Sequence, residues 1–225
     1  MKGTGYMKSK RAVICFAGLA MIALSSWAAA ADLNDITLPS PRTDGGMPLM
    51  QALKQRQTTR DFSSKPLPAQ VLADLLWAAC GINRVDSGKR TAPTARNWQE
   101  VDVYAVTSDG AYRYDAKANV LRMVAKGDLR KLTGRQAFPA TAPLNLVYVV
   151  DLERMPGASP EAQSLYSGTD IGFVSQNVYL FCASEGLATV VRGSVDREPL
   201  AKALSLTESQ KIILCQTLGY PGTAE

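Results

Sequence analysis

Blocks of hydrophobic and polar positions run along most of the chain and predict a series of short helices and strands. Apolar residues lie four positions apart just after Pro48, which is the pattern of a short helix that starts at a proline. Residues 68–81 have an apolar face at helical spacing and end on a glycine, so we expect a second helix there. Residues 81–99 have almost no regular pattern, and so long a loop in a compact domain is usually functional.

Short apolar runs bounded by polar residues predict the strands. Residues 145–152 form an almost unbroken apolar run, which is typical of a central strand buried on both faces. The runs 111–116 and 119–124 are separated by a short turn-like pair and indicate a hairpin. Three further strands are expected over residues 101–106, 188–195 and 211–221.

The longest predicted helix starts at Ser159-Pro160-Glu161, which supplies an N-cap, a proline at the first helical position and an acid in the first turn. It can extend to Gly186 and is apolar on most sides, so we expect it in the core of the protein or of a dimer. Shorter helices are expected over residues 127–134 and 196–204. Because strands and helices mix without strict βαβ alternation, the predicted fold class is α+β, with a central mixed sheet flanked by helices.

The first 31 residues lie outside this pattern and predict a cleaved export signal. A basic stretch up to Arg11 is followed by an apolar run, residues 12–24, and then by small residues. The apolar run is short for a membrane span, which makes an uncleaved anchor the less favoured alternative. Cleavage is expected near Ala30, which places the mature protein in the periplasm. Residues 9–14, SKRAVI, resemble a weakened twin-arginine signal, and an ordinary Sec signal is the other route.

Removing the predicted signal changes the charge of the protein. The chain has 25 basic and 20 acidic residues, and four basic but no acidic residues lie in residues 1–31, which leaves 21 minus 20, or +1. A basic surface for nucleic acid is therefore not expected. Residues 32–46 are polar and predict an extended leader, and residues 47–225 predict a single domain with a substantial core.

Histidine is absent from the chain, which excludes nucleophilic catalysis based on histidine and the usual zinc and haem ligand sets. No metal site is expected. Beyond the predicted signal there are three cysteines, Cys80, Cys182 and Cys215, without CxxC spacing. Because all three lie in apolar surroundings, we expect buried thiols and no disulfide framework.

Four short segments, taken in order and with their spacing, resemble the FMN-dependent nitroreductase family. They are RQTTRDF at 56–62, PTARNWQ at 93–99, SEGLATVV at 184–191 and LGYP at 218–221. Each segment is short, so the evidence lies in their order and spacing. The resemblance extends from Met47 to Pro221, and it implies a nitroreductase-like fold in which the long helix forms a dimer core.

The resemblance also implies a set of FMN-binding residues. These are Arg56, Gln57, Thr58, Arg60, Pro93, Thr94, Asn97, Gln136, Val191, Arg192 and Gly193. Arg56 would clamp the phosphate through charge-assisted bonds with help from the Thr58 hydroxyl. Arg60 would lie near N1 and O2 of the flavin, where a positive charge stabilises the reduced anion.

The remaining residues of this set would surround the flavin ring. Pro93, Thr94 and Asn97 match family positions that often reach the cofactor from the partner subunit. Gln136 matches an amide that binds the pyrimidine edge. Residues 191–193 match a strand end where a backbone N–H commonly faces N5, and Arg192 would bind an anionic substrate or point to solvent.

Two features depart from the family pattern. Many members have a cation beyond the last strand that reaches the phosphate, whereas this sequence ends GTAE, so we expect weaker retention of FMN. The hairpin at 112–124 resembles the subgroup of azoline-forming peptide dehydrogenases.

The function implied is that of an exported FMN oxidoreductase, a homodimer that passes hydride through flavin N5 to or from a small electron-poor or unsaturated substrate by a ping-pong mechanism. No catalytic side chain is expected, and the electron donor is not indicated. The alternatives are a non-catalytic periplasmic flavin-binding protein and a related fold that has lost its cofactor.

Overall fold

The computed structural model describes residues 1–3 and 34–222 of the chain. The predicted export signal and its cleavage site therefore lie outside the described residues, except for the first three. The helices and strands are β1 Ile36–Thr37, α1 Leu49–Gln55, α2 Ala69–Cys80, β2 Ile82–Arg84, β3 Lys89–Arg90, β4 Val101–Val106, β5 Gly110–Asp115, β6 Val120–Lys126, β7 Leu144–Asp151, α3 Pro160–Ser184, β8 Ala188–Arg192, α4 Arg197–Ala203 and β9 Gln210–Gly219. Within the described residues, no helix is both long enough and apolar enough to cross a membrane.

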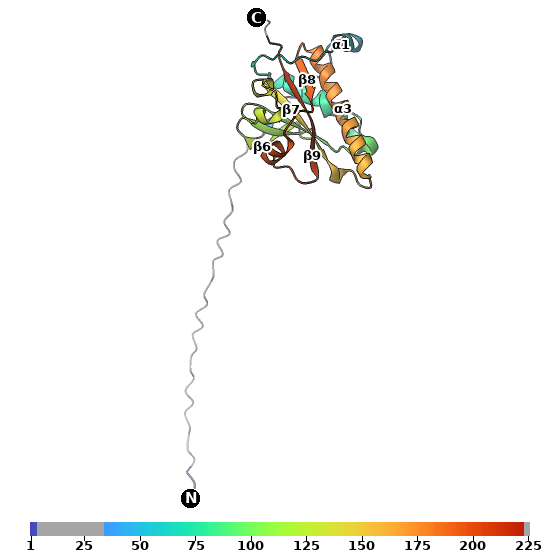
Figure 1. Ribbon diagram of the computed structural model, residues 1–225. Helices are drawn as coiled ribbons and strands as arrows, with labels where there is room; N and C mark the ends of the chain where they lie inside the picture. The colour runs from blue at the N-terminus through green and yellow to red at the C-terminus, as the bar shows by residue number, and fades with distance from the viewer. Residues whose placement is uncertain (4–33, 223–225) are drawn as a thin grey trace. The chain divides into compact units, whose positions relative to one another are not determined.

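The core of the domain is a seven-stranded sheet in the order β1-β6-β5-β4-β7-β9-β8. A separate two-stranded sheet, β2-β3, lies in the segment that was expected to be a loop. Figure 1 shows α3 running alongside the large sheet, with α1 and β8 near its C-terminal end. The predicted α+β fold class, a large sheet flanked by helices, is confirmed.

The expected mixed sheet is wrong in one respect, because every pair of neighbouring strands in the described sheet is antiparallel. The reason lies in the position of β9. Strands β7 and β8 run in the same direction and are joined through α3, but β9 lies between them and pairs antiparallel with both. The parallel crossover is therefore present in the chain path without a parallel pair in the sheet.

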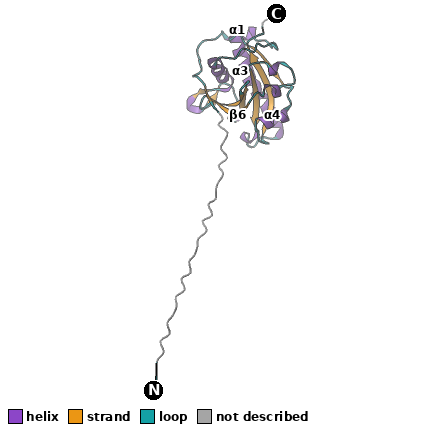
Figure 2. Ribbon diagram, turned by 90° about the vertical axis from the view of Figure 1, so that its left-hand side faces the viewer, coloured by secondary structure: helices purple, strands orange, loops and turns teal. Residues whose placement is uncertain are grey.

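Both faces of the sheet are covered, as the apolar run of β7 predicts. Seven of its eight residues are buried. Leu146 and Tyr148 pack in the cluster that includes α2 and α3, whereas Val147 and Val149 pack in the cluster that includes α4. Figure 2 shows α3 and α4 on opposite sides of the sheet. The alternation follows from the two-residue period of a strand.

The predicted start of α3 is confirmed in detail. Ser159 is the N-cap and its hydroxyl oxygen accepts a hydrogen bond from the backbone N–H of Ala162 at 3.2 Å, with Pro160 at the first helical position. The helix runs for 25 residues to Ser184. Cys80, Cys182 and Cys215 are buried free thiols, as expected.

Gly81 ends α2, as predicted, but for a reason that the sequence does not reveal. Its φ of −68° and ψ of 166° are open to any residue, so no left-handed conformation requires glycine here. A Cβ atom at this position would overlap the side chain and the Cα atom of Trp77. Close contact with Trp77 is therefore what requires glycine.

We expect Gly81→Ala to lower the free energy of unfolding by about 1–3 kcal/mol because the added methyl group overpacks against Trp77. Urea unfolding of the single variants and of the double variant with Trp77→Leu would measure the coupling between the two positions. The alanine should cost less when Trp77 is replaced by the smaller leucine. Overlap with the Cα atom of residue 77 remains in both backgrounds, so an equal cost in both would show that the Trp77 ring is not what opposes a larger residue at position 81.

Candidate active site

The segment 56–62 follows α1 and runs beside β8. There Tyr179 of α3 contacts three residues of the predicted FMN-binding set. The Tyr179 hydroxyl lies 3.0 Å from the Thr58 Oγ1 and accepts a hydrogen bond from the Val191 N–H at 3.1 Å. The guanidinium carbon of Arg56 lies 5.4 Å from the centre of the Tyr179 ring. The structure therefore brings together Arg56, Thr58 and Val191, which the sequence analysis assigned to one site.

Tyr179 is a site residue that the sequence analysis missed. It lies in the apolar stretch of α3, where the pattern indicates only packing. The N–H of Thr59 also donates to the carbonyl of Thr189 at 3.0 Å, so this segment is held to β8 by its backbone as well. A pocket of about 200 Å³ lies between the segment and the end of α3, lined in part by Gln57, Thr59 and Tyr179.

The two arginines of the segment are available to an anion. Arg60 is exposed and Arg56 is half-buried. Among the described residues, no ion pair within 4.0 Å involves either side chain. Two cations four residues apart, without carboxylate partners among the described residues, suit an anionic group such as a phosphate.

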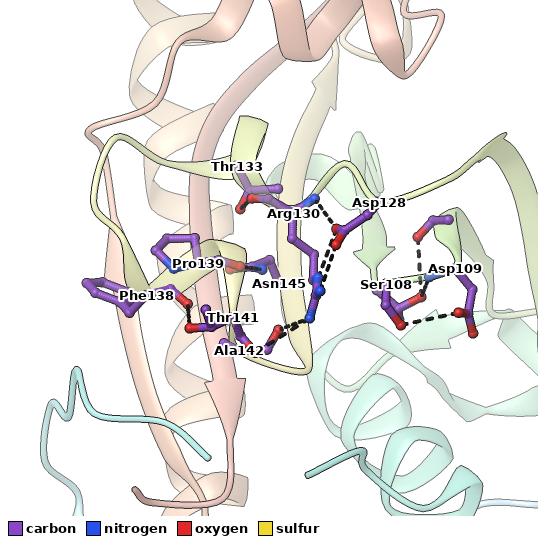
Figure 3. A network of polar contacts seen from close by, with 12 residues as sticks. Ser108, Asp109, Asp128, Arg130, Thr133, Phe138, Pro139, Thr141, Ala142 and Asn145 are labelled. Atoms are coloured by element: carbon purple, nitrogen blue, oxygen red, sulfur yellow. Dashed lines mark hydrogen bonds and ion pairs between the residues drawn. The ribbon is translucent and has the colours of Figure 1, made fainter. Parts of the chain in front are cut away.

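The loop that carries Gln136 is fixed at several points, and Gln136 itself is exposed. Figure 3 shows Arg130 paired with Asp128 and donating to the carbonyl of Ala142 at 3.0 Å. The Asn145 amide donates to the carbonyl of Pro139 at 2.8 Å. On the other side of the loop, the N–H of Arg135 donates to the carbonyl of Ser194 at 3.2 Å, just beyond β8.

The sequence analysis expected Arg192 to bind an anionic substrate or to point to solvent. The structure contradicts the solvent-exposed position and gives the side chain protein partners. Its side chain is buried, and its guanidinium donates to the Thr217 Oγ1, the Thr133 carbonyl and the Asn145 Oδ1. The neighbouring Gly193 is exposed, and a Cβ atom there would touch only Leu214, at 3.7 Å. Gly193 is therefore the residue at the end of β8 whose backbone is exposed.

The second loop of the predicted site, residues 93–99, lies nearer the N-terminal end of α3 than Tyr179 does. Pro93 and Asn97 are exposed, but the Thr94 hydroxyl donates to a Glu100 carboxylate oxygen at 3.0 Å and also accepts the Gln99 N–H. The loop is tied to α3 by the Ala95 N–H, which donates to Asp170 at 2.9 Å.

A single chain does not bring the two halves of the predicted site together. Asp170 and Tyr179 are nine residues apart on α3, and a helix rises 1.5 Å per residue, so about 14 Å of helix separates the two halves.

A buried pair of carboxyl groups supports this second loop. Glu100 and Asp170 are buried near each other, and the Glu100 Oε1 has no hydrogen-bond partner among the described residues. The loop beside them has positive φ angles at Arg96 (51°), Asn97 (56°) and Gln99 (51°). Such angles are costly for residues other than glycine. Burial, and then the neighbouring Asp170, raise the pKa of Glu100 to about 7.

We expect the free energy of unfolding to fall as pH rises from about 4.5 to about 7. In this window the folded protein holds a proton on Glu100 that the unfolded chain, with its pKa near 4.5, has lost. At about 1.4 kcal/mol for each unit of pKa difference, the loss amounts to about 3 kcal/mol.

Glu100→Gln should abolish most of this slope and be more stable than the wild type at pH 8, because glutamine keeps an acceptor for Thr94 and gives Asp170 a donor. Urea unfolding across this pH range measures the effect. Glu208→Gln, which removes an exposed carboxylate, serves as the control and should keep the wild-type slope. A wild-type slope in Glu100→Gln would contradict the assignment.

The larger cavities of the domain lie away from these residues. One of about 500 Å³ is bounded by the leader, α1, α2 and α3, and one of about 820 Å³ lies between the β2-β3 sheet and the turn that joins β5 to β6. Neither is lined by any residue of the predicted site. We therefore place the candidate site at the end of β8, where the polar groups converge.

The fold and this site define a nitroreductase-type α+β domain. The model of the Nitroreductase family matches residues 53–220, and the chain belongs to that family. A nitroreductase-type protein from Methanocaldococcus jannaschii is 26% identical over 193 residues, which cover 81% of this chain and 96% of that one.

Solved structures agree with the family assignment. A crystal structure of a nitroreductase-type protein from Ralstonia eutropha is 43% identical, with a TM-score of 0.81 over 84% of this chain and 90% of that chain. The NADPH:FMN oxidoreductase of Vibrio harveyi, solved with NAD+, is 20% identical, with a TM-score of 0.56 over 77% of this chain and 68% of that chain. At that identity the second comparison supports the fold alone.

Proposed function

We propose that the protein is an exported FMN-dependent oxidoreductase that acts as a homodimer on a small electron-poor or unsaturated substrate by a ping-pong mechanism. The observation that carries this proposal is the cluster of Arg56, Thr58 and Val191 around Tyr179. Among the described residues, neither Arg56 nor Arg60 forms an ion pair. Family membership supports a flavin oxidoreductase. Export and the likeness to azoline-forming dehydrogenases stay predictions from the sequence.

The described residues fit FMN as follows. Bound FMN would supply the hydride chemistry at its N5 atom. Arg56 and Thr58 would bind the phosphate, and Arg60 would stabilise negative charge on the ring. Because the Val191 N–H already donates to Tyr179, we assign the donor toward N5 to the exposed backbone of Gly193.

A homodimer is supported by two features of the single chain. Large apolar side chains are exposed on α1 and α3, among them Met50 at 75%, Leu165 at 62% and Phe173 at 42%. The loop with Pro93 and Asn97 is attached to α3 at Asp170, about 14 Å along the helix from Tyr179, which contacts Thr58 and Arg56 of the same chain. A second copy would cover the apolar residues and bring its own loop to the site.

The visible absorption spectrum of the protein lacking residues 1–31, with added FMN and then a reductant and an acceptor, tests the proposal. Flavin bands near one FMN for each chain, bleached on reduction and restored by an electron-poor acceptor, are expected. Bound FMN without turnover of any acceptor would favour the alternative of a flavin-binding protein. No binding at excess FMN would refute both.

Arg56→Gln should raise the dissociation constant for FMN by about 10- to 100-fold, because it removes a charge-assisted bond worth about 1.5–3 kcal/mol. Quenching of FMN fluorescence on titration with the protein measures the constant. The control is Arg113→Gln, which removes an exposed arginine of β5 outside the site. Equal affinities of Arg56→Gln and the wild type would remove Arg56 from the site.

Phe173→Asp should weaken the homodimer by at least tenfold in dissociation constant, because a charge would be buried in its apolar core. Sedimentation velocity over a range of concentrations measures this effect. Ile36→Asp, which alters an apolar residue of β1 at the opposite edge of the sheet, should associate as the wild type does. A monomeric wild type would refute the dimer.

A further inference from the structure

A cavity of about 820 Å³ lies where strands β4 and β5 separate. The two strands pair only at residues 104–106 of β4, and the pair nearest the cavity is Tyr104 with Arg113. Continuing this register along both strands would set Asp102 directly opposite Asp115, and like charges in that position are destabilising. The strands separate before that pair forms, and both aspartates line the cavity.

Arginines outside the cavity neutralise both aspartates. Arg154 donates to the Asp102 carboxylate at 2.6 Å, and Arg122 pairs with Asp115 at 3.4 Å. Neither arginine is part of the lining, in which Asp102 and Asp115 are the only acidic residues among those that the structure describes. The negative charge of the lining is therefore already paired.

Three cations of the lining have no acidic partner. They are Arg90, Arg113 and Lys117, and none of them forms an ion pair within 4.0 Å in the described part of the chain. Arg90 is half-buried, whereas the other two are exposed and screened by solvent. The Arg90 guanidinium donates to two neutral acceptors, the Gln99 Oε1 at 2.8 Å and the Cys80 carbonyl at 3.1 Å, which leaves other N–H donors for a ligand.

A buried hydroxyl at the cavity also lacks a partner. Tyr114 lines the cavity and is 6% exposed, and its hydroxyl forms no hydrogen bond with the other described residues. Burial raises the pKa of Tyr114 above its usual value, so the hydroxyl keeps its proton and can donate. A buried phenol usually has a hydrogen-bond partner, and a ligand oxygen in the cavity would supply one.

Apolar side chains complete the lining. Trp77 near the end of α2, and Ile82 and Val85 in the segment that follows, supply this surface. The Trp77 indole N–H already donates to the Ile82 carbonyl at 3.2 Å, which leaves the ring to pack against a ligand. Small-molecule sites usually have volumes of about 300–1,000 Å³ and combine apolar walls with a few polar groups.

We propose that this cavity binds a small organic carboxylate, with the carboxylate group at Arg90 and Tyr114 and an apolar body against Trp77. A guanidinium can donate to both oxygens of a carboxylate, and one enclosed guanidinium matches its single negative charge. The site is separate from the candidate FMN site, because no residue of the predicted FMN-binding set lines the cavity. It therefore does not depend on the proposed function.

The wild-type protein gives the first test, by isothermal titration calorimetry with one aromatic and one aliphatic probe, 3-phenylpropionate and hexanoate. We expect saturable binding of at least one probe, with about one ligand for each chain. The uncharged analogues 3-phenylpropanamide and hexanamide should bind at least about tenfold more weakly, because they lack the charge that Arg90 recognises. Failure of both carboxylates to bind at concentrations up to about 10 mM, or equal binding of acids and amides, would overturn the proposal.

Four variants locate the bound carboxylate. Arg90→Gln should raise its dissociation constant by about tenfold or more, and Tyr114→Phe by about 3- to 10-fold, because each removes a donor. Lys126→Gln, which removes an exposed cation of β6 outside the lining, should bind as the wild type does. Arg56→Gln, which alters the candidate FMN site, should also keep the wild-type affinity.

The outcomes separate this site from the FMN site. Binding weakened in Arg56→Gln but not in Arg90→Gln would place the carboxylate at the candidate active site and overturn the proposal. Wild-type affinity in both Arg90→Gln and Tyr114→Phe would overturn it as well. Thermal unfolding of each variant identifies one that fails to fold. If Arg90→Gln fails, Tyr114→Phe and the comparison of acids with amides in the wild type decide.

Discussion

The insertion of β9 between β7 and β8 is the constraint on which the rest of this structure depends. It converts a parallel crossover through α3 into an antiparallel sheet, and it sets which residues of three strands face each other. Because side chains alternate along a strand, adjacent residues of β9 serve opposite faces of the sheet. A slip of one residue in the pairing would exchange the two faces.

Gln216 and Thr217 show what this register achieves. Gln216 accepts a hydrogen bond from the buried Tyr148 hydroxyl at 2.5 Å and donates to the Thr189 Oγ1 at 3.0 Å. Thr217 accepts from Arg192 and donates to Asn145 at 2.6 Å. Gln216 and Thr217 are both buried, and burying their polar side chains without these hydrogen bonds would lower the stability of the fold. The correct register therefore satisfies both networks at once, and any other register leaves them unpaired.

The sequence pattern predicted the elements well where hydrophobicity is periodic. The strand expected over 101–106 is β4 with the same bounds, and the run expected over 145–152 is β7 within one residue. The start of α3 followed from its capping residues, which act locally. The order of the strands could not be predicted from the sequence pattern, because the position of β9 depends on contacts between distant parts of the chain. A pattern along the chain reports burial and gives no strand neighbours.

The candidate site was predicted in part for the same reason. Arg56 and Thr58 were assigned through the resemblance, and the structure brings them together with Val191. Tyr179, which joins them, carried no signal in an apolar helix. Arg192 was expected at an anionic substrate or in solvent through the resemblance at the end of the strand, whereas it is buried. Only the fold reveals the neutral acceptors that surround it.

Arg192 and the pair of Glu100 and Asp170 are both buried ionisable groups, and burial disfavours the charged form of each. Among the described residues, the first is a buried cation without an ion pair, and the second is a pair of buried acids without an ion pair. The carboxyl pair solves the problem by retaining a proton, as the raised pKa of Glu100 indicates. An arginine cannot release its proton within the range of pH that proteins tolerate. Its charge therefore persists at the end of β8, where three neutral acceptors, the Thr217 Oγ1, the Thr133 carbonyl and the Asn145 Oδ1, stabilise it through hydrogen bonds.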